Sequence, residues 1–127
     1  FDFIGALRKD RVRTTHNFVR AMYKRPQSDA YYERVAQASL RVPLAAAIEL
    51  LSYPYPRNYW REAIYGTTKP VLFAVTPRWA EQGANLMRKH ANAKTAVFHD
   101  AGHALFVDEA DRFNRLIQEF LAERGIW

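Results

Sequence analysis

The feature that most restricts the fold is a pair of short apolar runs in the second half of the chain, KPVLFAV at residues 69–75 and KTAVFHD at residues 94–100. Each has the length and the Val and Phe content of a strand buried on both faces. The residues between them have room for one helix at 78–90, with Leu86 and Met87 on its inner side. A strand, a helix and a strand in this order predict a parallel βαβ unit.

A final helix is expected within residues 108–125, with Asp108 as its N-cap and Gly125 as its terminator. The second half therefore predicts the edge of an α/β sheet. Two strands do not complete such a sheet, because a parallel sheet needs further strands and helices on both faces. We expect another segment to pair with it, either from a companion chain or from upstream in the protein.

The first half of the chain has a helical pattern divided by prolines. We expect helices at residues 8–24, at 29–39 with Ser28 as the N-cap, at 43–52 with Pro43 in the first turn, and at 57–65. The opening FDFI has the character of a strand end. The predicted organisation is a strand end at 1–4, a helical region at 5–68 and a βαβα region at 69–127.

Composition argues against several classes of protein. The 127 residues are 49% apolar and include no cysteine, which allows one core and removes disulfides and thiol chemistry. No run is long and apolar enough for a membrane span and no secretory leader is recognisable, so we expect a cytoplasmic protein without membrane contact. No phosphate-binding glycine loop or metal-ligand spacing is found, and we expect no cofactor and no metal.

The net charge of +6 arises in the first half, where Lys and Arg cluster at residues 8–25. They alternate with Val12, Val19 and Met22 at helical spacing, which favours the solvated face of an amphipathic helix. No nucleic-acid module accompanies them, so we expect no nucleic-acid partner. An alternative function is a non-catalytic interaction module that binds an acidic partner through this helix.

His103 is the residue whose position most favours chemistry. It follows Gly102 in the loop after the second strand, at the edge where open α/β sheets place their sites. Gly102 is expected to permit a backbone conformation that a larger residue would resist. An imidazole has a pKa near neutrality, which suits a general base. His99 is expected to be structural, and His16 and His90 are expected to be surface residues on helices.

The segment KPVLFAV, a helix, and then NAKTAVFHDAGHALFVDEADRFNRLIQEFL resembles the C-terminal part of the α/β-hydrolase fold. The helical residues 8–65 are similar in position and character to the cap that this family inserts before its last strands. The resemblance implies a hydrolase that acts on carboxylic esters or related acyl substrates, with His103 as the base of a nucleophile–histidine–acid triad. Lactonase, epoxide hydrolase and dehalogenase chemistries share this half of the fold and stay open.

The acid that would orient His103 has three possible origins. In haloalkane dehalogenases and some relatives it ends the strand before the cap, and FDFI is similar to that stretch, which places the acid at Asp2. In many other relatives it follows the strand that here reads PVLFAV, where the first carboxylate is Glu81. The third possibility is an acid outside this chain.

The nucleophile is expected to come from outside these 127 residues. None of the serines lies in the G-x-S-x-G context that exposes a nucleophile between a strand and a helix; they are Ser28, Ser39 and Ser52. The aromatic residues of the second half of the cap, and one beside the histidine, could line an apolar substrate pocket; they are Tyr53, Tyr55, Tyr59, Trp60, Tyr65 and Phe106.

Overall fold

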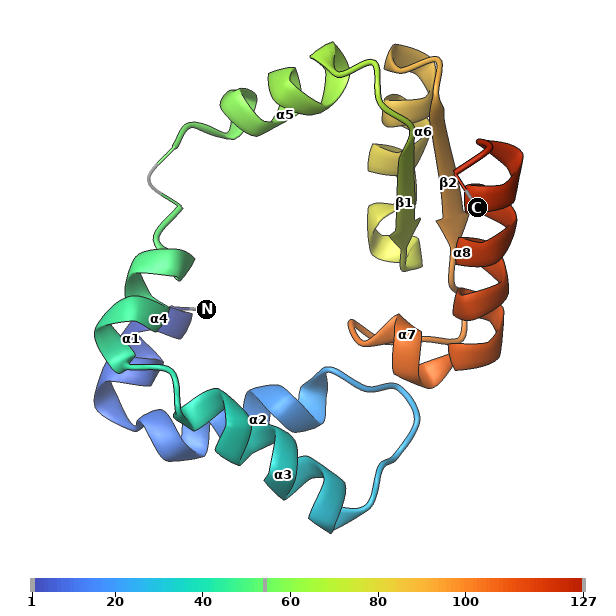
Figure 1. The fold of residues 1–127 in the computed structure, drawn as a ribbon. Helices are drawn as coiled ribbons and strands as arrows, with labels where there is room; N and C mark the ends of the chain where they lie inside the picture. Colours follow the sequence, from blue (N-terminus) through green and yellow to red (C-terminus); the bar gives the residue numbers. More distant parts are fainter. Residues whose placement is uncertain (1, 54, 127) are drawn as a thin grey trace.

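The computed structural model describes residues 2–53 and 55–126, and the regular elements of its first half are helices (Figure 1). They are α1 (Phe3–Lys9), α2 (Arg11–Ala21), α3 (Asp29–Leu40), α4 (Leu44–Leu51) and α5 (Arg57–Gly66). The prediction that Ser28 caps a helix is confirmed, because its Oγ accepts a hydrogen bond from the Tyr31 N–H at 3.2 Å.

Two aspartates change the predicted start of the chain. The predicted helix at 8–24 is divided at Asp10, which ends α1 and whose carboxylate caps α2 by accepting from the Arg13 N–H at 3.0 Å. The prediction of a strand end at 1–4 is wrong for its described residues. Asp2 is the N-cap of α1, accepting from the Gly5 N–H at 2.8 Å, and the helix begins at Phe3. An aspartate one residue before the apolar run provides the cap that favours a helix there.

Helices α2 and α3 pack against each other around a small apolar core. Its buried members are Val19, Tyr32 and Ala36. The Arg11 guanidinium adds a polar connection, because its Nη2 donates to the backbone carbonyls of Leu40, at 3.1 Å, and Val42. The start of α2 is thereby held against the end of α3.

The second half contains the predicted parallel strand pair, β1 (Val71–Val75) and β2 (Ala93–Val97), in the register Val71 to Ala93. Between them run a 3-10 turn, η1 (Pro77–Trp79), and α6 (Ala80–Lys89). After β2 come a single-turn helix, α7 (Leu105–Asp108), and the long α8 (Ala110–Glu123). The sequence prediction of strand, helix, strand and helix is confirmed.

Helices cover both faces of this two-stranded sheet. On one face α6 lies so close to β2 that a Cβ at Gly83 would overlap the Thr95 side chain. On the other face Phe98, Ala101 and Leu105 form a buried cluster with Phe113 and other apolar residues of β1, β2 and α8. The cores of the two halves are thus separate.

The elements follow one another around an open ring (Figure 1). Along the top of the view, α5 leads from the helical half to β1. On the opposite side the segment between α2 and α3 returns to the loop before α7, where the Ala104 N–H donates to the Met22 carbonyl at 2.8 Å. The halves therefore touch at a point that is distant in sequence from their covalent junction.

Two details at the ends of the α/β elements differ from the sequence predictions. Asp108 is not the N-cap of the last helix: it ends α7, is 2% exposed, and α8 begins after Glu109. His90 is not a surface residue, since it is 4% exposed and its Nδ1 accepts from the Asn92 N–H at 3.0 Å. Gly125 is confirmed as the terminator of α8, where φ is +64° and glycine is favoured.

Candidate active site

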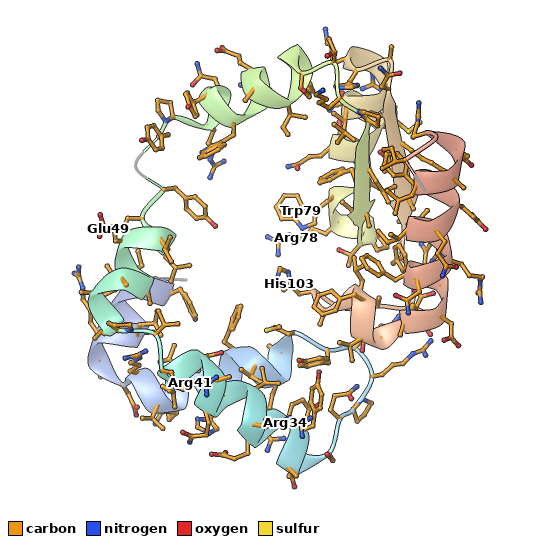
Figure 2. All side chains as sticks on the ribbon, in the orientation of Figure 1. Arg34, Arg41, Glu49, Arg78, Trp79 and His103 are labelled. Atoms are coloured by element: carbon orange, nitrogen blue, oxygen red, sulfur yellow. The ribbon has the colours of Figure 1, made fainter. Side chains whose placement is uncertain are left out.

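His103 lies in the loop between β2 and α7, at the carboxyl end of the sheet. Its side chain is exposed and lines an open cleft of about 740 Å³. Val75 and Thr76, where β1 ends, and Arg78 and Trp79 of η1 line the same cleft. Figure 2 shows Arg78, Trp79 and His103 projecting into the same central opening. The predicted place of the histidine is therefore correct.

Gly102 is required beside the histidine because another part of the backbone comes very close. A Cβ at this position would lie 2.7 Å from the Met22 carbonyl oxygen and 2.9 Å from the Lys24 nitrogen. From the sequence, Gly102 is expected to supply backbone freedom. The structure gives a different reason, the close approach of the segment between α2 and α3.

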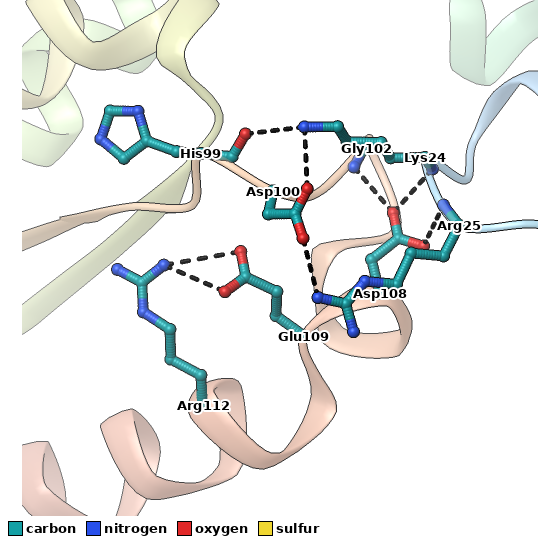
Figure 3. A network of polar contacts seen from close by, with 8 residues as sticks. All are labelled: Lys24, Arg25, His99, Asp100, Gly102, Asp108, Glu109 and Arg112. Atoms are coloured by element: carbon teal, nitrogen blue, oxygen red, sulfur yellow. Dashed lines mark hydrogen bonds and ion pairs between the residues drawn. The ribbon is translucent and has the colours of Figure 1, made fainter.

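The buried carboxylate of Asp108 holds this close approach together (Figure 3). Its Oδ2 accepts from the backbone N–H groups of Gly102 at 2.7 Å and Lys24 at 2.8 Å, and its Oδ1 accepts from Arg25 N–H at 3.1 Å. Burial alone would raise the pKa of Asp108, but these three donors and the Arg25 charge outweigh it and hold the pKa below its usual value. We call these four residues the Asp108 network.

The side chains of Lys24 and Arg25 make further contacts beside the Asp108 network. Lys24 and Arg25 both form ion pairs with Asp100, at 3.0 and 2.9 Å, and lower the pKa of that carboxyl through their hydrogen bonds, Lys24 most. The Lys24 ammonium also donates to the His99 carbonyl at 3.0 Å. The His103 loop is thus connected to the helical half by both backbone and side-chain contacts (Figure 3).

His99 itself is exposed, and only its backbone carbonyl takes part in these contacts. The prediction of a structural side chain is therefore wrong for its imidazole. The sequence does not reveal the Asp108 network, because its local pattern favours Asp108 as the cap of the last helix. The sequence signal that could have indicated this network is Asp108 itself, an acid five residues after His103 and before the last helix.

No described carboxylate forms a hydrogen bond with the His103 imidazole. The carboxylate of Asp2 bonds to the Gly5 N–H, and Glu81 is exposed in the first turn of α6 and does not line the cleft. Aromatic contacts connect the start of α1 to the histidine: the Phe3 and Phe18 rings are 5.2 Å apart, and the Phe18 and His103 rings 6.5 Å. Asp2 directly precedes this series of rings, and its role as the orienting acid stays a prediction.

The serines of the chain have local structural roles. Ser28 caps α3, and the Oγ atoms of Ser39 and Ser52 donate to the carbonyls of Val35 and Ile48, one turn earlier in their own helices. Such bonds fix a hydroxyl against its helix. Among the residues described, none of these hydroxyls contacts His103.

Aromatic residues of the helical half line two further clefts. One, of about 490 Å³, lies between α5 and the sheet and includes Trp60, Tyr65 and Phe73. The other, of about 740 Å³, includes Tyr53, Tyr55 and Trp60. Tyr59 stacks on Tyr55 at 5.0 Å. Phe106 does not line the His103 cleft, and its ring instead lies 6.1 Å from the Phe113 ring.

The described ranges contain no group of three or more potential metal ligands. Within the same ranges, every helix is too short or too polar to cross a bilayer.

Comparison with solved structures relates this arrangement to an esterase from Exiguobacterium antarcticum. The TM-score is 0.79 at 16% sequence identity, and the match covers 94% of this chain and 46% of the esterase. The chain thus spans about half the length of that enzyme. No known family profile matches the sequence, and no curated protein matches it either.

The class that these observations define is an α/β protein with a distant fold relation to an esterase. The α/β class agrees with the prediction from the sequence, and the detailed α/β-hydrolase arrangement stays a prediction. At this level of identity the likeness concerns the fold alone.

Proposed function

We propose that this chain is the helical cap and the histidine-bearing C-terminal part of an α/β-hydrolase that cleaves carboxylic esters or related acyl substrates. The observation that supports this most is the place of His103. It is an exposed imidazole in a cleft at the carboxyl end of parallel strands, on a loop fixed by a buried carboxylate, within a fold similar to part of an esterase.

In this proposal His103 takes the proton of a nucleophile as it attacks the ester carbonyl, and gives it to the alcohol that leaves, so that the acyl group is bound to the nucleophile. Water then attacks this acyl group, its proton passes to the same imidazole, and the nucleophile regains a proton as the acid is released. Asp2 is proposed to orient the imidazole. The nucleophile comes from a companion chain or an upstream segment, since Ser28, Ser39 and Ser52 are occupied in capping and intrahelical bonds. No metal or cofactor enters these steps, and we propose the cytoplasm as the compartment.

The alternative, an interaction module with a basic helix, is less well supported. Of the cations at residues 8–25, Arg11 binds two carbonyls, Arg20 pairs with Asp29 at 2.8 Å, and Lys24 and Arg25 pair with Asp100. These contacts are made within the chain. Ion pairs within the chain therefore engage Arg20, Lys24 and Arg25, and the cluster offers an acidic partner less free charge than the sequence indicates.

The experiment uses the intact protein, purified with any polypeptide that accompanies it. Turnover of 4-nitrophenyl acetate is measured, and samples quenched in acid during turnover are analysed by peptide mass spectrometry. We expect hydrolysis and an acetyl group on a residue outside the 127 residues. An acetyl group on Ser28, Ser39 or Ser52 would contradict the proposed origin of the nucleophile, and absence of turnover would contradict the proposed function.

A further inference from the structure

The cleft beside His103 contains positive charge and no matching carboxylate. Arg57 and Arg78 are among its described lining residues, and none of those residues is Asp or Glu. Neither arginine forms an ion pair within the described part of the chain. Both side chains are exposed to whatever enters the cleft.

The local structure places Arg78 at the same edge of the sheet as the histidine. Strand β1 ends at Val75, the partner of Val97 in β2, and Pro77 starts η1 immediately afterwards. Arg78 and His103 therefore belong to the loops that leave neighbouring parallel strands at the same edge of the sheet. Figure 2 shows both side chains pointing into the same opening.

Three other exposed arginines pair with carboxylates of the chain. Arg20 pairs with Asp29 at 2.8 Å, Arg25 with Asp100 at 2.9 Å and Arg112 with Glu109 at 3.3 Å. Two guanidinium groups that share a cleft without such a partner repel each other, and an anion that enters removes this repulsion. The planar guanidinium fits a carboxylate through two parallel hydrogen bonds.

We propose that this cleft selects esters that carry a free carboxylate. Arg78 binds the carboxylate, Arg57 adds to the attraction, and the ester bond lies toward His103. Trp79, which is 44% exposed and whose ring lies 5.0 Å from the Arg78 guanidinium, offers an apolar face to the carbon chain of the substrate. This inference rests on the proposed function, because it names the substrate class of the same site.

The test compares two esters that differ in one charge, mono-4-nitrophenyl glutarate and its methyl-capped neutral analogue. In the intact protein, kcat/KM should be higher for the anionic ester, and the preference should fall at high ionic strength. Arg78→Ala should lower the ratio of the two kcat/KM values by about 10- to 100-fold, and Arg78→Lys should lower it less. Arg41→Ala is the matched control, because Arg41 is exposed on the helical half and does not line the cleft.

Binding of glutarate itself, measured by calorimetry on the same variants, keeps this test separate from the proposed function. If both esters are hydrolysed and Arg78→Ala leaves their ratio unchanged, the substrate class is wrong and the hydrolase stands. If neither ester is hydrolysed but glutarate binds and Arg78→Ala weakens binding, the hydrolase is wrong and the anion site stands. If neither ester is hydrolysed and glutarate does not bind, both the hydrolase and the anion site are wrong. The same conclusion follows if neither ester is hydrolysed and glutarate binds equally to Arg78→Ala and Arg41→Ala.

Discussion

The Asp108 carboxylate accepts a hydrogen bond from the Gly102 N–H at 2.7 Å, one residue before His103. The same carboxylate accepts hydrogen bonds from the backbone N–H groups of Lys24 and Arg25, which lie more than 80 residues earlier in the chain. One buried side chain therefore positions the candidate catalytic loop against the helical half. Asp108 is a positioning residue in this account, since it acts through the backbone of the His103 loop.

The first prediction concerns Asp108→Asn. The amide can accept only through its oxygen, so at least one of the three N–H groups loses its partner, at a cost of about 1–3 kcal/mol in the free energy of unfolding. Displacement of the His103 loop should also lower kcat for ester hydrolysis by about 10- to 100-fold. Melting curves and turnover are compared with Asp111→Asn, an exposed acid of the next helix. Equal effects of the two substitutions on kcat would contradict the positioning role.

The second prediction follows from the lowered pKa of Asp108. A carboxyl whose pKa is lower in the folded than in the unfolded state stabilises the fold above the unfolded pKa, and this contribution is lost as the pH falls through the folded pKa. The wild-type protein should therefore lose more stability than Asp108→Asn between about pH 5 and pH 2. If the free energy of unfolding falls equally in the two proteins across this pH range, the prediction is contradicted.

The third prediction concerns Gly102→Ala. The new methyl group would meet the Met22 carbonyl at 2.7 Å, and the backbone would have to separate, at a cost of about 1–3 kcal/mol together with a loss of turnover. Gly66→Ala is the matched control, because a Cβ at this position, at the end of α5, would meet nothing within 4 Å. It should leave stability unchanged or raise it by up to about 1 kcal/mol. Equal melting temperatures for the two variants would contradict the close approach.

The elements that could be predicted from the sequence are those set by local patterns. The two strands, the Ser28 cap and the Gly125 terminator depend on residues close together in the chain, and the structure contains them all. The strand end at 1–4 failed because FDFI is too short to distinguish a strand from a capped helix without considering Asp2 as the cap.

The support of the His103 loop could not be predicted in the same way. Asp108 binds the N–H groups of Lys24 and Arg25, and nothing in the local sequence around either segment indicates that they meet. The burial of His90 has the same origin, because it depends on how α6 packs against the sheet. The place of His103 was predictable from the strand that precedes it, whereas the residues that hold it there depend on tertiary contacts.

The fourth prediction concerns the sheet. In the described residues β1 pairs with β2 alone, so the backbone groups on its other edge have no strand partner. Residues 1–127 expressed alone should therefore aggregate or exchange strands, and a segment that pairs along β1 should prevent this. Sedimentation and thermal melting test it. A monomer with a cooperative transition would contradict the need for a pairing segment.

The fifth prediction distinguishes the candidate acids. If Asp2 orients the imidazole of His103, Asp2→Asn in the intact protein should lower kcat by up to about 10⁴-fold, while Glu81→Gln should change it little. Asparagine can still cap α1 through its side-chain oxygen, so Asp2→Asn should change the free energy of unfolding little, which a melting curve checks separately from the effect on turnover. A large effect of Glu81→Gln alone would move the acid to the start of α6, and no effect of either would place it outside this chain.

The account depends most on His103, and the most direct measurement is ester turnover by His103→Ala in the intact protein, with a melting curve beside it. His99→Ala is the control, because His99 is an exposed imidazole four residues earlier whose side chain takes no part in the Asp108 network. We predict that His103→Ala lowers kcat by at least about 10³-fold and changes the free energy of unfolding by less than about 0.5 kcal/mol, whereas His99→Ala changes both little. Turnover by His103→Ala within a few-fold of wild type would contradict the assignment of His103 as the base and, with it, the proposed hydrolase.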